Sequence, residues 1–412
     1  MKKVLIISYN FPPKSGISSR RWAKLSKALT RSGIECYILT RDGVAETGYN
    51  WSRDIKQLDQ NRIITVKNIY PRYFERSYSS FLLNGLKYVG IKILRSTFFQ
   101  IDASQLMYKR LISKARELID QGVNNIIVSG PPHSLIYQTS ILKYENPEIN
   151  LILDYRDAWN DELNYKYLTN IHSLKRKTES IQMELLSLNC ADKVLLVTDD
   201  LRSRLSKIHD HWSHKFMAFH NFFDLEDYQE SFEKIKRSKN IVYLGTIKSG
   251  RRKSISLIIN ALIKLEEEGV EFDRQFHFYT KDNFTPFFRD KVHLETIKKY
   301  FRFYPIVDSS KVWKVLEKYS FCLSINDPNY SHAFGTKIFD YMALKKTIIH
   351  ISNGGELYNL LKNQNHLVSN YKLESMIDML KQLQKVNFDF IDYEFNEFDL
   401  NNKVQQLIKY LK

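Results

Sequence analysis

The chain has 412 residues, 43% of them hydrophobic, which suits two folded domains of about 200 residues each. The formal net charge of +16 favours an anionic partner: a phosphorylated substrate, nucleic acid or an acidic membrane surface. Three well-separated cysteines argue against a disulfide framework or a structural zinc site. No apolar run approaches the ~18 residues of a membrane-spanning helix, so we expect a soluble or peripheral protein.

The first half of the chain alternates short apolar runs with helical patterns, as βαβ units do. Val4–Ser8 predicts the first strand, and Ser18–Ser32 predicts a helix that ends at Gly33. A long helix is expected over about His172–Cys190. The further strands predicted here are Cys36–Thr40, Ile126–Ser129, Leu151–Asp154 and Val194–Thr198.

The second half repeats this alternation after a charged stretch, Asp224–Lys239, that has no clear period. We therefore predict domains at 1–222 and 240–390, with a linker at 223–239. The predicted helices are Ser254–Glu268, Lys337–Leu344 and Glu356–Leu361, and the predicted strands are Ile241–Leu244, Phe276–Tyr279, Phe301–Pro305, Phe321–Ile325 and Ile348–Ile351. Such alternation predicts parallel sheets with helices on both faces, and ligands beyond the carboxyl ends of the strands.

The loop after the first strand contains two prolines, a glycine and two arginines before its helix. Gly16 permits a tight turn, and the first helical N–H groups together with Arg20 or Arg21 suit an anionic ligand. The alternative is an ordinary connecting loop with solvated arginines.

Two more strand exits carry polar residues. His133 lies on a proline-stiffened loop, where its imidazole can hydrogen-bond a hydroxyl or a phosphate, although a lone loop histidine is often only part of the surface. Arg156 and Asp157 follow the strand Leu151–Asp154, and we expect Arg156 to be structural and Asp157 to face the ligand.

The stretch Gly245–Arg252 resembles the phosphate-binding pattern G-x-x-x-x-G-K-[ST] between a strand and a helix. Arg251 replaces the lysine and Arg252 replaces the hydroxyl that would hold magnesium, so an NTPase is excluded. Two interpretations remain. The glycine-rich loop presents Arg251, Arg252 or Lys253 to a phosphate, or it is a solvated basic turn.

The strongest signal is the stretch Gly335–Met342, which opens a helix after a long loop. Lys337 at the helix N-terminus makes an anion site suited to a diphosphate. Asp340 lies three residues further on, near the same face, where it can accept hydrogen bonds from ribose hydroxyls.

Six of these segments, in this order, resemble GT-B glycosyltransferases, particularly family 4 members of bacterial polysaccharide and lipid-linked sugar pathways. The resemblance implies an α/β fold with two Rossmann-like domains that face each other across a cleft. The first domain would take the acceptor, the second would take the nucleotide sugar, and segment 391–412 would return to the first domain through a helix at Lys403–Leu411. The segments that carry the resemblance are Tyr9–Arg21, Ser129–Ser134, Asp154–Trp159, Ala191–Val194, Tyr243–Thr246 and Gly335–Met342.

The resemblance implies a retaining hexosyltransferase that uses a UDP- or GDP-type donor and needs neither a cofactor nor a metal ion. Its implied catalytic residues are His133 and Asp157. Arg20 and Arg156 would line the acceptor side of the cleft. The implied donor-binding residues are Gly16, Arg251, Arg252, Lys337 and Asp340.

The sequence departs from the family pattern at two places. His332 stands where the family often has the first of two glutamates, and Asn221–Asp224 lacks the usual Asn-Gly. Two further functions therefore stay open: a non-catalytic scaffold or partner subunit with this fold, and a nucleotide-sugar epimerase.

The segment from residue 67 to 116 holds ten basic and two acidic residues. Within it, Leu82, Leu86, Val89 and Ile93 recur at helical spacing. A basic amphipathic helix of this kind can lie on an anionic membrane, so we expect a peripheral protein at the cytoplasmic face that meets a lipid-linked or oligosaccharide acceptor. Alternatively, the apolar face packs on the first domain. No nucleic-acid-binding motif is present.

Overall fold

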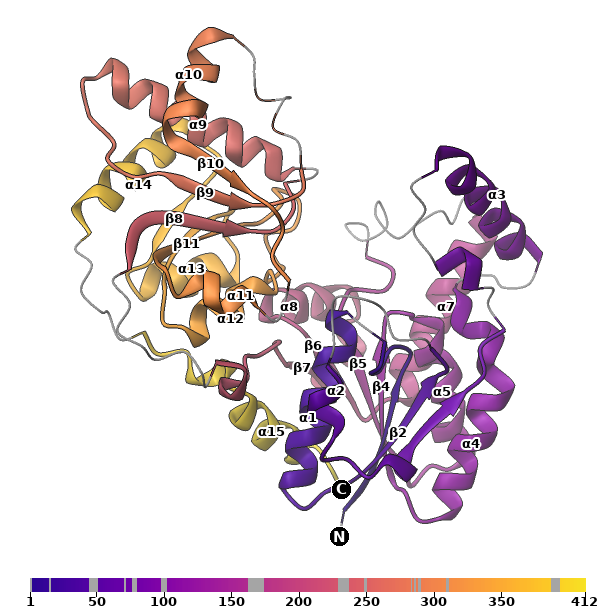
Figure 1. Cartoon of the computed structure of the whole chain (residues 1–412). Coiled ribbons are helices and arrows are strands. Elements are labelled where there is room, and N and C mark those ends of the chain that lie inside the picture. The colour runs from indigo at the N-terminus through magenta and orange to yellow at the C-terminus, as the bar shows by residue number, and fades with distance from the viewer. Residues whose placement is uncertain are drawn as a thin grey trace. The chain divides into compact units, whose positions relative to one another are not determined.

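The computed structural model of the chain describes residues 2–14, 16–43, 51–69, 72–75, 80–97, 102–161, 174–228, 237–247, 250–282, 284, 287, 290–308, 311–386 and 393–412. The chain forms two compact units (Figure 1). Unit 1 comprises Met1–His220 and Lys403–Lys412, and unit 2 comprises Asn221–Asn402. Part of the predicted linker, residues 229–236, lies outside the described residues.

Unit 1 contains a seven-stranded parallel sheet with the order β3-β2-β1-β4-β5-β6-β7. Its central strands are buried on both faces, which explains their continuous apolar runs. In register, Ile6 of β1 lies between Ile38 of β2 and Ile127 of β4. The strands are β1 Lys3–Ser8, β2 Glu35–Arg41, β3 Ile63–Val66, β4 Asn125–Gly130, β5 Asn150–Tyr155, β6 Lys193–Leu196 and β7 Phe216–Ala218.

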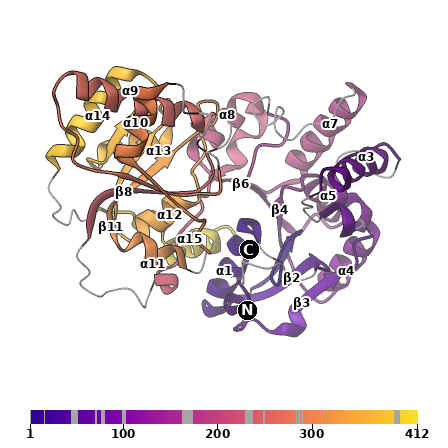
Figure 2. The same ribbon diagram turned by 45° about the horizontal axis from the view of Figure 1, so that its top comes forward.

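Helices cover both faces of this sheet (Figures 1 and 2). Trp22, Leu25 and Leu29, spaced as one side of a helix, turn α1 toward one face, whereas α4, α5 and α7 pack on the other. The bounds are α1 Ile17–Arg31, α2 Ser52–Ile55, α3 Phe81–Thr97, α4 Tyr108–Asp120, α5 Ser134–Glu145, α7 Leu174–Cys190 and α8 Asp199–Ile208, with 3-10 turns η2 at Arg72–Glu75 and η3 at Ala103–Met107.

The end of the sequence also belongs to unit 1. Helix α15 spans Leu400–Ile408, and Gln406 donates a hydrogen bond to the carbonyl of Ala218 over 3.0 Å. Asn150 Nδ2 reaches the carbonyl of Tyr410 over 2.8 Å. Residues 403–412 are therefore fastened to the sheet of the first unit.

Unit 2 contains a six-stranded parallel sheet with the order β10-β9-β8-β11-β12-β13. An isolated parallel bridge between Phe223 and Asp399 joins the two ends of this unit's chain. The strands are β8 Ser238–Leu244, β9 Phe276–Tyr279, β10 Phe301–Tyr304, β11 Tyr319–Ile325, β12 Thr347–Ile351 and β13 Leu367–Ser369.

The second sheet is likewise covered on both faces. Helices α9 (Arg251–Glu267), α10 (Lys291–Tyr300) and α14 (Leu373–Lys385) pack on one face, and α11 (Val312–Leu316), α12 (Lys337–Ala343) and α13 (Glu356–Asn363) pack on the other (Figure 1). The predicted fold class, α/β with two parallel Rossmann-like sheets, is confirmed. Within the described ranges, no helix combines the length and the apolar character needed to cross a membrane.

Candidate functional site

Each sheet has one place where the strand order reverses: between β1 and β4 in unit 1, and between β8 and β11 in unit 2. In open parallel sheets, ligands bind at the carboxyl ends of the strands at such a switch point. The predicted site residues follow the strands that flank these points or the next strand, β5. Gly16 and Arg20 follow β1, His133 follows β4, Arg156 and Asp157 follow β5, Arg251 and Arg252 follow β8, and Lys337 and Asp340 follow β11.

The loop after β1 turns into α1 at Gly16, which has φ of 110°. L-residues rarely adopt this conformation, so a side chain at this position would strain the turn. Asn10 Nδ2 donates to Ser18 Oγ over 3.4 Å and ties the loop to the first helical turn. The guanidinium of Arg20 lies 5.0 Å from the centre of the Trp51 ring, a cation–π contact within unit 1.

Arg21, in contrast, is buried and has a structural role. Its Nη2 lies 2.9 Å from Asp154 Oδ1, and its Nη1 donates to the carbonyl of His220 over 3.2 Å. Trp22 Nε1 and Ser129 Oγ donate to the other carboxylate oxygen of Asp154 over 2.9 and 2.8 Å. The charge of Arg21 is thus neutralised within the unit.

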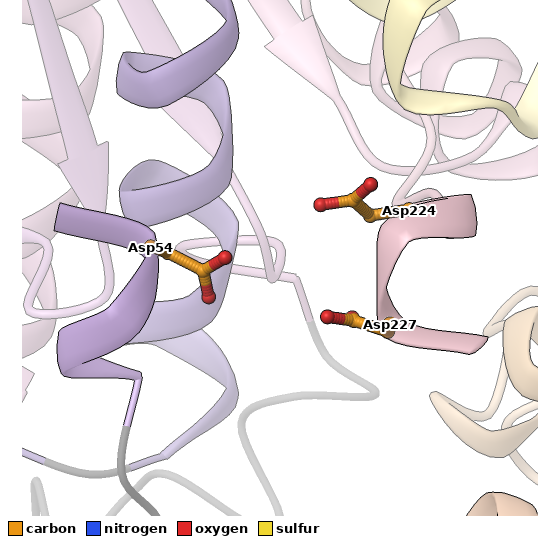
Figure 3. Close-up of side chains that lie close together, drawn as sticks. All are labelled: Asp54, Asp224 and Asp227. Atoms are coloured by element: carbon orange, nitrogen blue, oxygen red, sulfur yellow. The ribbon is translucent and has the colours of Figure 1, made fainter. Parts of the chain in front are cut away.

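A second buried carboxylate holds α2 against α1. Asp54 of α2 (Figure 3) accepts hydrogen bonds from Lys24 and Lys27 of α1 over 3.1 and 3.4 Å. All three side chains are nearly inaccessible to solvent. These buried ion pairs connect α2 to α1.

The loop after β5 is tied to the loop after β4 through Arg156. Its Nε donates to Ser129 Oγ over 3.1 Å, and its Nη2 donates to the carbonyl of Pro131. Burial lowers the pKa of Arg156 below its usual value. The neighbouring Asp157 has an exposed side chain.

His133 is nine-tenths buried beside these loops. Its Nε2 lies 3.1 Å from the carbonyl oxygen of Asp157. Because a carbonyl oxygen only accepts, Nε2 carries the proton and Nδ1 keeps a lone pair. The ring stacks on Trp159 with centroids 5.3 Å apart, and burial lowers the pKa of His133, so the imidazole is neutral at neutral pH.

A buried polar network holds Trp159 under the histidine. Trp159 Nε1 donates to Ser180 Oγ over 3.0 Å, and Asn160 Nδ2 donates to Glu184 Oε2 over 2.7 Å. Burial raises the pKa of Glu184 to about 7. Glu184 and Ser180 lie on a helix far from the loop in sequence, so no local pattern indicated that they support His133.

In unit 2, the loops after β8 and β11 are in direct contact. Gly250 N donates to Asp327 Oδ2 over 2.9 Å. A Cβ atom at Gly250 would lie 2.6 Å from Asp327 Oδ1 and 2.6 Å from Pro328 Cδ. The second glycine of the predicted phosphate loop therefore allows a close approach of two loops, and its N–H group is already bonded.

The cationic residues that follow Gly250 differ in their environments. Arg251 is half-buried, and its Nη1 donates to the carbonyl of Thr246 over 3.3 Å. Arg252 and Lys253 are exposed in the first turn of α9, and Lys253 Nζ lies 5.6 Å from the centre of the Tyr371 ring. No hydrogen bond or ion pair joins the Arg252 side chain to another residue in the described part of the chain.

At the start of α12, Lys337 Nζ lies 3.3 Å from Asp340 Oδ2. The other carboxylate oxygen of Asp340 accepts a hydrogen bond from Tyr228 Oη over 2.5 Å. Asp340 is buried, whereas the Lys337 side chain is 37% exposed, so the lysine is the more accessible of the two.

Tyr228 ends the turn η5 (Leu225–Tyr228), a part of unit 2 that no sequence pattern singled out. Asp224 precedes this turn, and its Oδ1 accepts from the N–H of Glu226 over 3.1 Å. Figure 3 shows the Asp224 and Asp227 side chains projecting from it. The turn thus supplies the phenol that holds Asp340.

No family model matches this sequence, and the search of curated proteins finds no match either. Solved structures match over almost the whole chain, however, and the fold is that of GT-B glycosyltransferase structures.

Among these structures is TarM of S. aureus in complex with Fondaparinux, alpha-GlcNAc-glycerol and UDP, with 13% identity, a TM-score of 0.57, and coverage of 100% of this chain and 99% of that chain. A glycosyltransferase from Rickettsia africae has 13% identity, a TM-score of 0.51, and coverage of 99% and 97%. A protein from Listeria monocytogenes assigned as a UDP-N-acetylglucosamine 2-epimerase has 10% identity, a TM-score of 0.53, and coverage of 99% and 95%. At these identities, the likeness concerns the fold.

Proposed function

We propose that the protein is a glycosyltransferase that moves a hexosyl group from a nucleotide sugar to a saccharide acceptor, with retention of anomeric configuration. The observation that carries this proposal is the pair of switch points, one rich in accessible cations and the other built around a neutral histidine. The likeness of the fold to TarM and to the Rickettsia africae glycosyltransferase supports it.

The donor would bind to unit 2. Arg252 and Lys253, together with Lys337, carry accessible positive charges after the two strands that flank the switch point. Charge-assisted hydrogen bonds from such groups would stabilise the diphosphate as it leaves, so that transfer would need no metal ion. UDP is the nucleotide we favour for the donor because the S. aureus TarM structure contains it.

The acceptor would meet unit 1. With its Nε2 proton held by Asp157, His133 offers Nδ1 as an acceptor for a sugar hydroxyl, and its neutral form at neutral pH suits this role. The exposed Asp157 carboxylate would bind a neighbouring hydroxyl. We also propose that this acceptor is linked to a lipid and that the protein works at the inner face of the membrane.

Thermal unfolding with UDP, GDP, dTDP and CMP tests the donor site. A nucleotide at about 100 times its Kd should add about 2.7 kcal/mol of stability. Arg252→Ala should weaken binding of that nucleotide, whereas Lys291→Ala, at an exposed lysine elsewhere in unit 2, should not. Lack of stabilisation by every nucleotide, or equal binding by the two variants, would contradict the donor site.

A transfer assay with radiolabelled nucleotide sugar tests the catalytic role of unit 1. His133→Gln should retain nucleotide binding and lose transfer by about 100-fold or more, since general-base groups contribute about 10²–10⁴-fold. An epimerase is the second candidate, favoured by the Listeria monocytogenes structure. It would convert the nucleotide sugar without any acceptor, which NMR of the donor alone would detect.

A further inference from the structure

Helix α3 (Phe81–Thr97) belongs to a long connection between β3 and α4 of unit 1. The connection runs from the end of β3 at Val66 to the start of α4 at Tyr108. Residues 81–93 of α3 have described burial, and none of them is buried. Figure 1 shows α3 standing apart from the sheet of its own unit.

The exposed side of α3 is apolar. Leu82, Leu86, Val89 and Ile93 recur every three or four residues and form one stripe, which we call the α3 stripe. Their exposed fractions lie between 54% and 76%, and Phe81 at the start of the helix is 91% exposed. The alternative in which this face packs on the first domain is therefore wrong. A contiguous exposed apolar patch of this kind marks an interaction site.

The orientation of the stripe is fixed by the turn η2. Tyr73 Oη donates to the carbonyl of Leu83 over 2.9 Å. Gly90 leaves room for the ring of Phe74, since a Cβ atom there would lie 2.5 Å from that ring. Leu83 and Gly90 share a face next to the stripe, so η2 holds the helix from one side and leaves the stripe turned outward.

The charge around the stripe identifies its partner. The sequence of α3 contains Lys87, Lys92 and Arg95 and no acidic residue, and the segment from 67 to 116 has ten basic and two acidic residues. Two copies of this surface would bring like charges together, which opposes self-association. An anionic lipid surface satisfies both the apolar stripe and the basic flank.

We infer that α3 binds an anionic membrane, lying in the headgroup region with the α3 stripe inserted among the acyl chains. Both ends of its connection lie at the carboxyl edge of the sheet, because β3 ends there and α4 begins there. Binding through α3 brings the bilayer to the edge that carries His133. This inference rests on the proposed function only for the identity of a lipid-linked acceptor; the membrane contact itself does not require catalysis.

Co-sedimentation of the full chain with lipid vesicles tests the inference. Vesicles of phosphatidylcholine mixed with phosphatidylglycerol should bind the protein at low salt, and vesicles of phosphatidylcholine alone should bind it much less. Leu86→Glu should weaken binding to the anionic vesicles by more than tenfold. Lys92→Gln should weaken it by about fivefold, the effect of one basic residue near the surface.

Two matched variants control for general effects of the substitutions. Ile306→Glu places the same charge at an equally exposed apolar residue of unit 2 and should bind vesicles as the wild type does. Lys291→Gln is the corresponding control for Lys92→Gln. Unchanged melting temperatures would verify that all four variants are folded.

Three outcomes would overturn the inference: no binding to anionic vesicles, equal binding to neutral vesicles, or equal binding by Leu86→Glu and the wild type. A wild-type dimer that Leu86→Glu converts to a monomer, without vesicle binding, would show that a second copy covers the stripe. Nucleotide binding is measured on the same preparations. Loss of vesicle binding with intact nucleotide binding would contradict the membrane surface alone, and the reverse would contradict the proposed donor site alone.

Discussion

The two switch points use similar residues in different ways. In unit 1, Arg21 is neutralised by the buried Asp154, and Arg156 is bonded to the neighbouring loop. In unit 2, Arg252 and Lys253 are exposed in the first turn of a helix. The cationic residues of both units follow parallel strands. They differ in burial: the buried arginines stabilise the fold, whereas the exposed ones are accessible to a ligand.

This difference has a consequence for ligand chemistry. A diphosphate needs accessible cations, and Arg252 and Lys253 of unit 2 are exposed. A sugar hydroxyl needs a hydrogen-bond acceptor, and the neutral His133 in unit 1 offers Nδ1 for this role. Four substitutions test whether the two switch points differ in this way.

The largest effect is expected for Arg21→Ala. This change leaves Asp154 buried without its charged partner and should lower the free energy of unfolding by about 3–5 kcal/mol. Urea-induced unfolding measures the loss. Arg252→Ala, the exposed arginine of unit 2, should change stability by no more than about 0.5 kcal/mol. Equal losses in the two variants would remove the distinction between the sites.

Glu184→Gln should change how stability depends on pH. The pKa of Glu184 is about 7 in the folded protein, against an ordinary value of 4.5, so between these values the folded protein keeps a proton that the unfolded chain has released. Wild-type stability should therefore fall as pH rises through this window, by up to about 1.4 kcal/mol per pH unit. The variant should lack this contribution and be the more stable protein above pH 7.

Urea unfolding at several pH values measures this dependence. Glu145→Gln serves as the control, because Glu145 is an accessible carboxylate whose pKa is lowered by its hydrogen bond with Arg116. Its removal should not raise stability at high pH. A wild-type curve that follows the Glu184→Gln curve throughout would indicate that Glu184 is ionised in the folded protein.

Gly250→Ala tests whether the close approach of the loops after β8 and β11 matters for stability, for nucleotide binding or for both. Its new methyl group would clash with Asp327 and Pro328, and overpacking of this kind costs about 1–3 kcal/mol. If the loops move apart to accommodate it, nucleotide affinity should fall by about tenfold, equivalent to about 1.4 kcal/mol. Calorimetric titration measures the affinity. Gly335→Ala, where a Cβ atom meets nothing within 4 Å, should bind as the wild type does.

The smallest effect on stability is expected for Lys337→Ala. Its ion pair with Asp340 is partly exposed, and pairs of this kind contribute about 0–1 kcal/mol. Lys264→Ala, which removes an exposed pair with Glu267, should cost a similar amount. Only Lys337→Ala should also weaken nucleotide binding. A loss of stability well above that of the control would assign Lys337 a structural role.

The central strands were predictable because their apolar runs reflect burial on both faces. The sequence placed Phe276–Tyr279 at its observed bounds and β1 to within one residue. Three strands escaped prediction: β3, β7 and β13, each of which is the outermost strand at one edge of its sheet. Not all of their residues are buried, so these strands lack the continuous apolar runs of the central strands.

The predicted site residues lie after the expected strands, but the sequence could not show which of their charges are available to a ligand. Arg20 and Arg21 are adjacent, yet one contacts Trp51 and the other is buried against Asp154. The partner Asp154 is 133 residues away along the chain. Likewise, Tyr228 reaches Asp340 across 112 residues. Pairings between such distant residues arise only from the tertiary fold.

The return of residues 403–412 to unit 1 affects the order in which the protein can be completed on the ribosome. Val404, Leu407 and Leu411 are buried in that unit, and Lys412 N donates to Asn125 Oδ1 over 2.8 Å. Unit 1 is synthesised first, but residues 403–412 follow unit 2 in the sequence. The apolar contacts of these residues with unit 1 can therefore form only after unit 2 has been synthesised. During that interval the nascent chain exposes the apolar surface that Leu407 later covers.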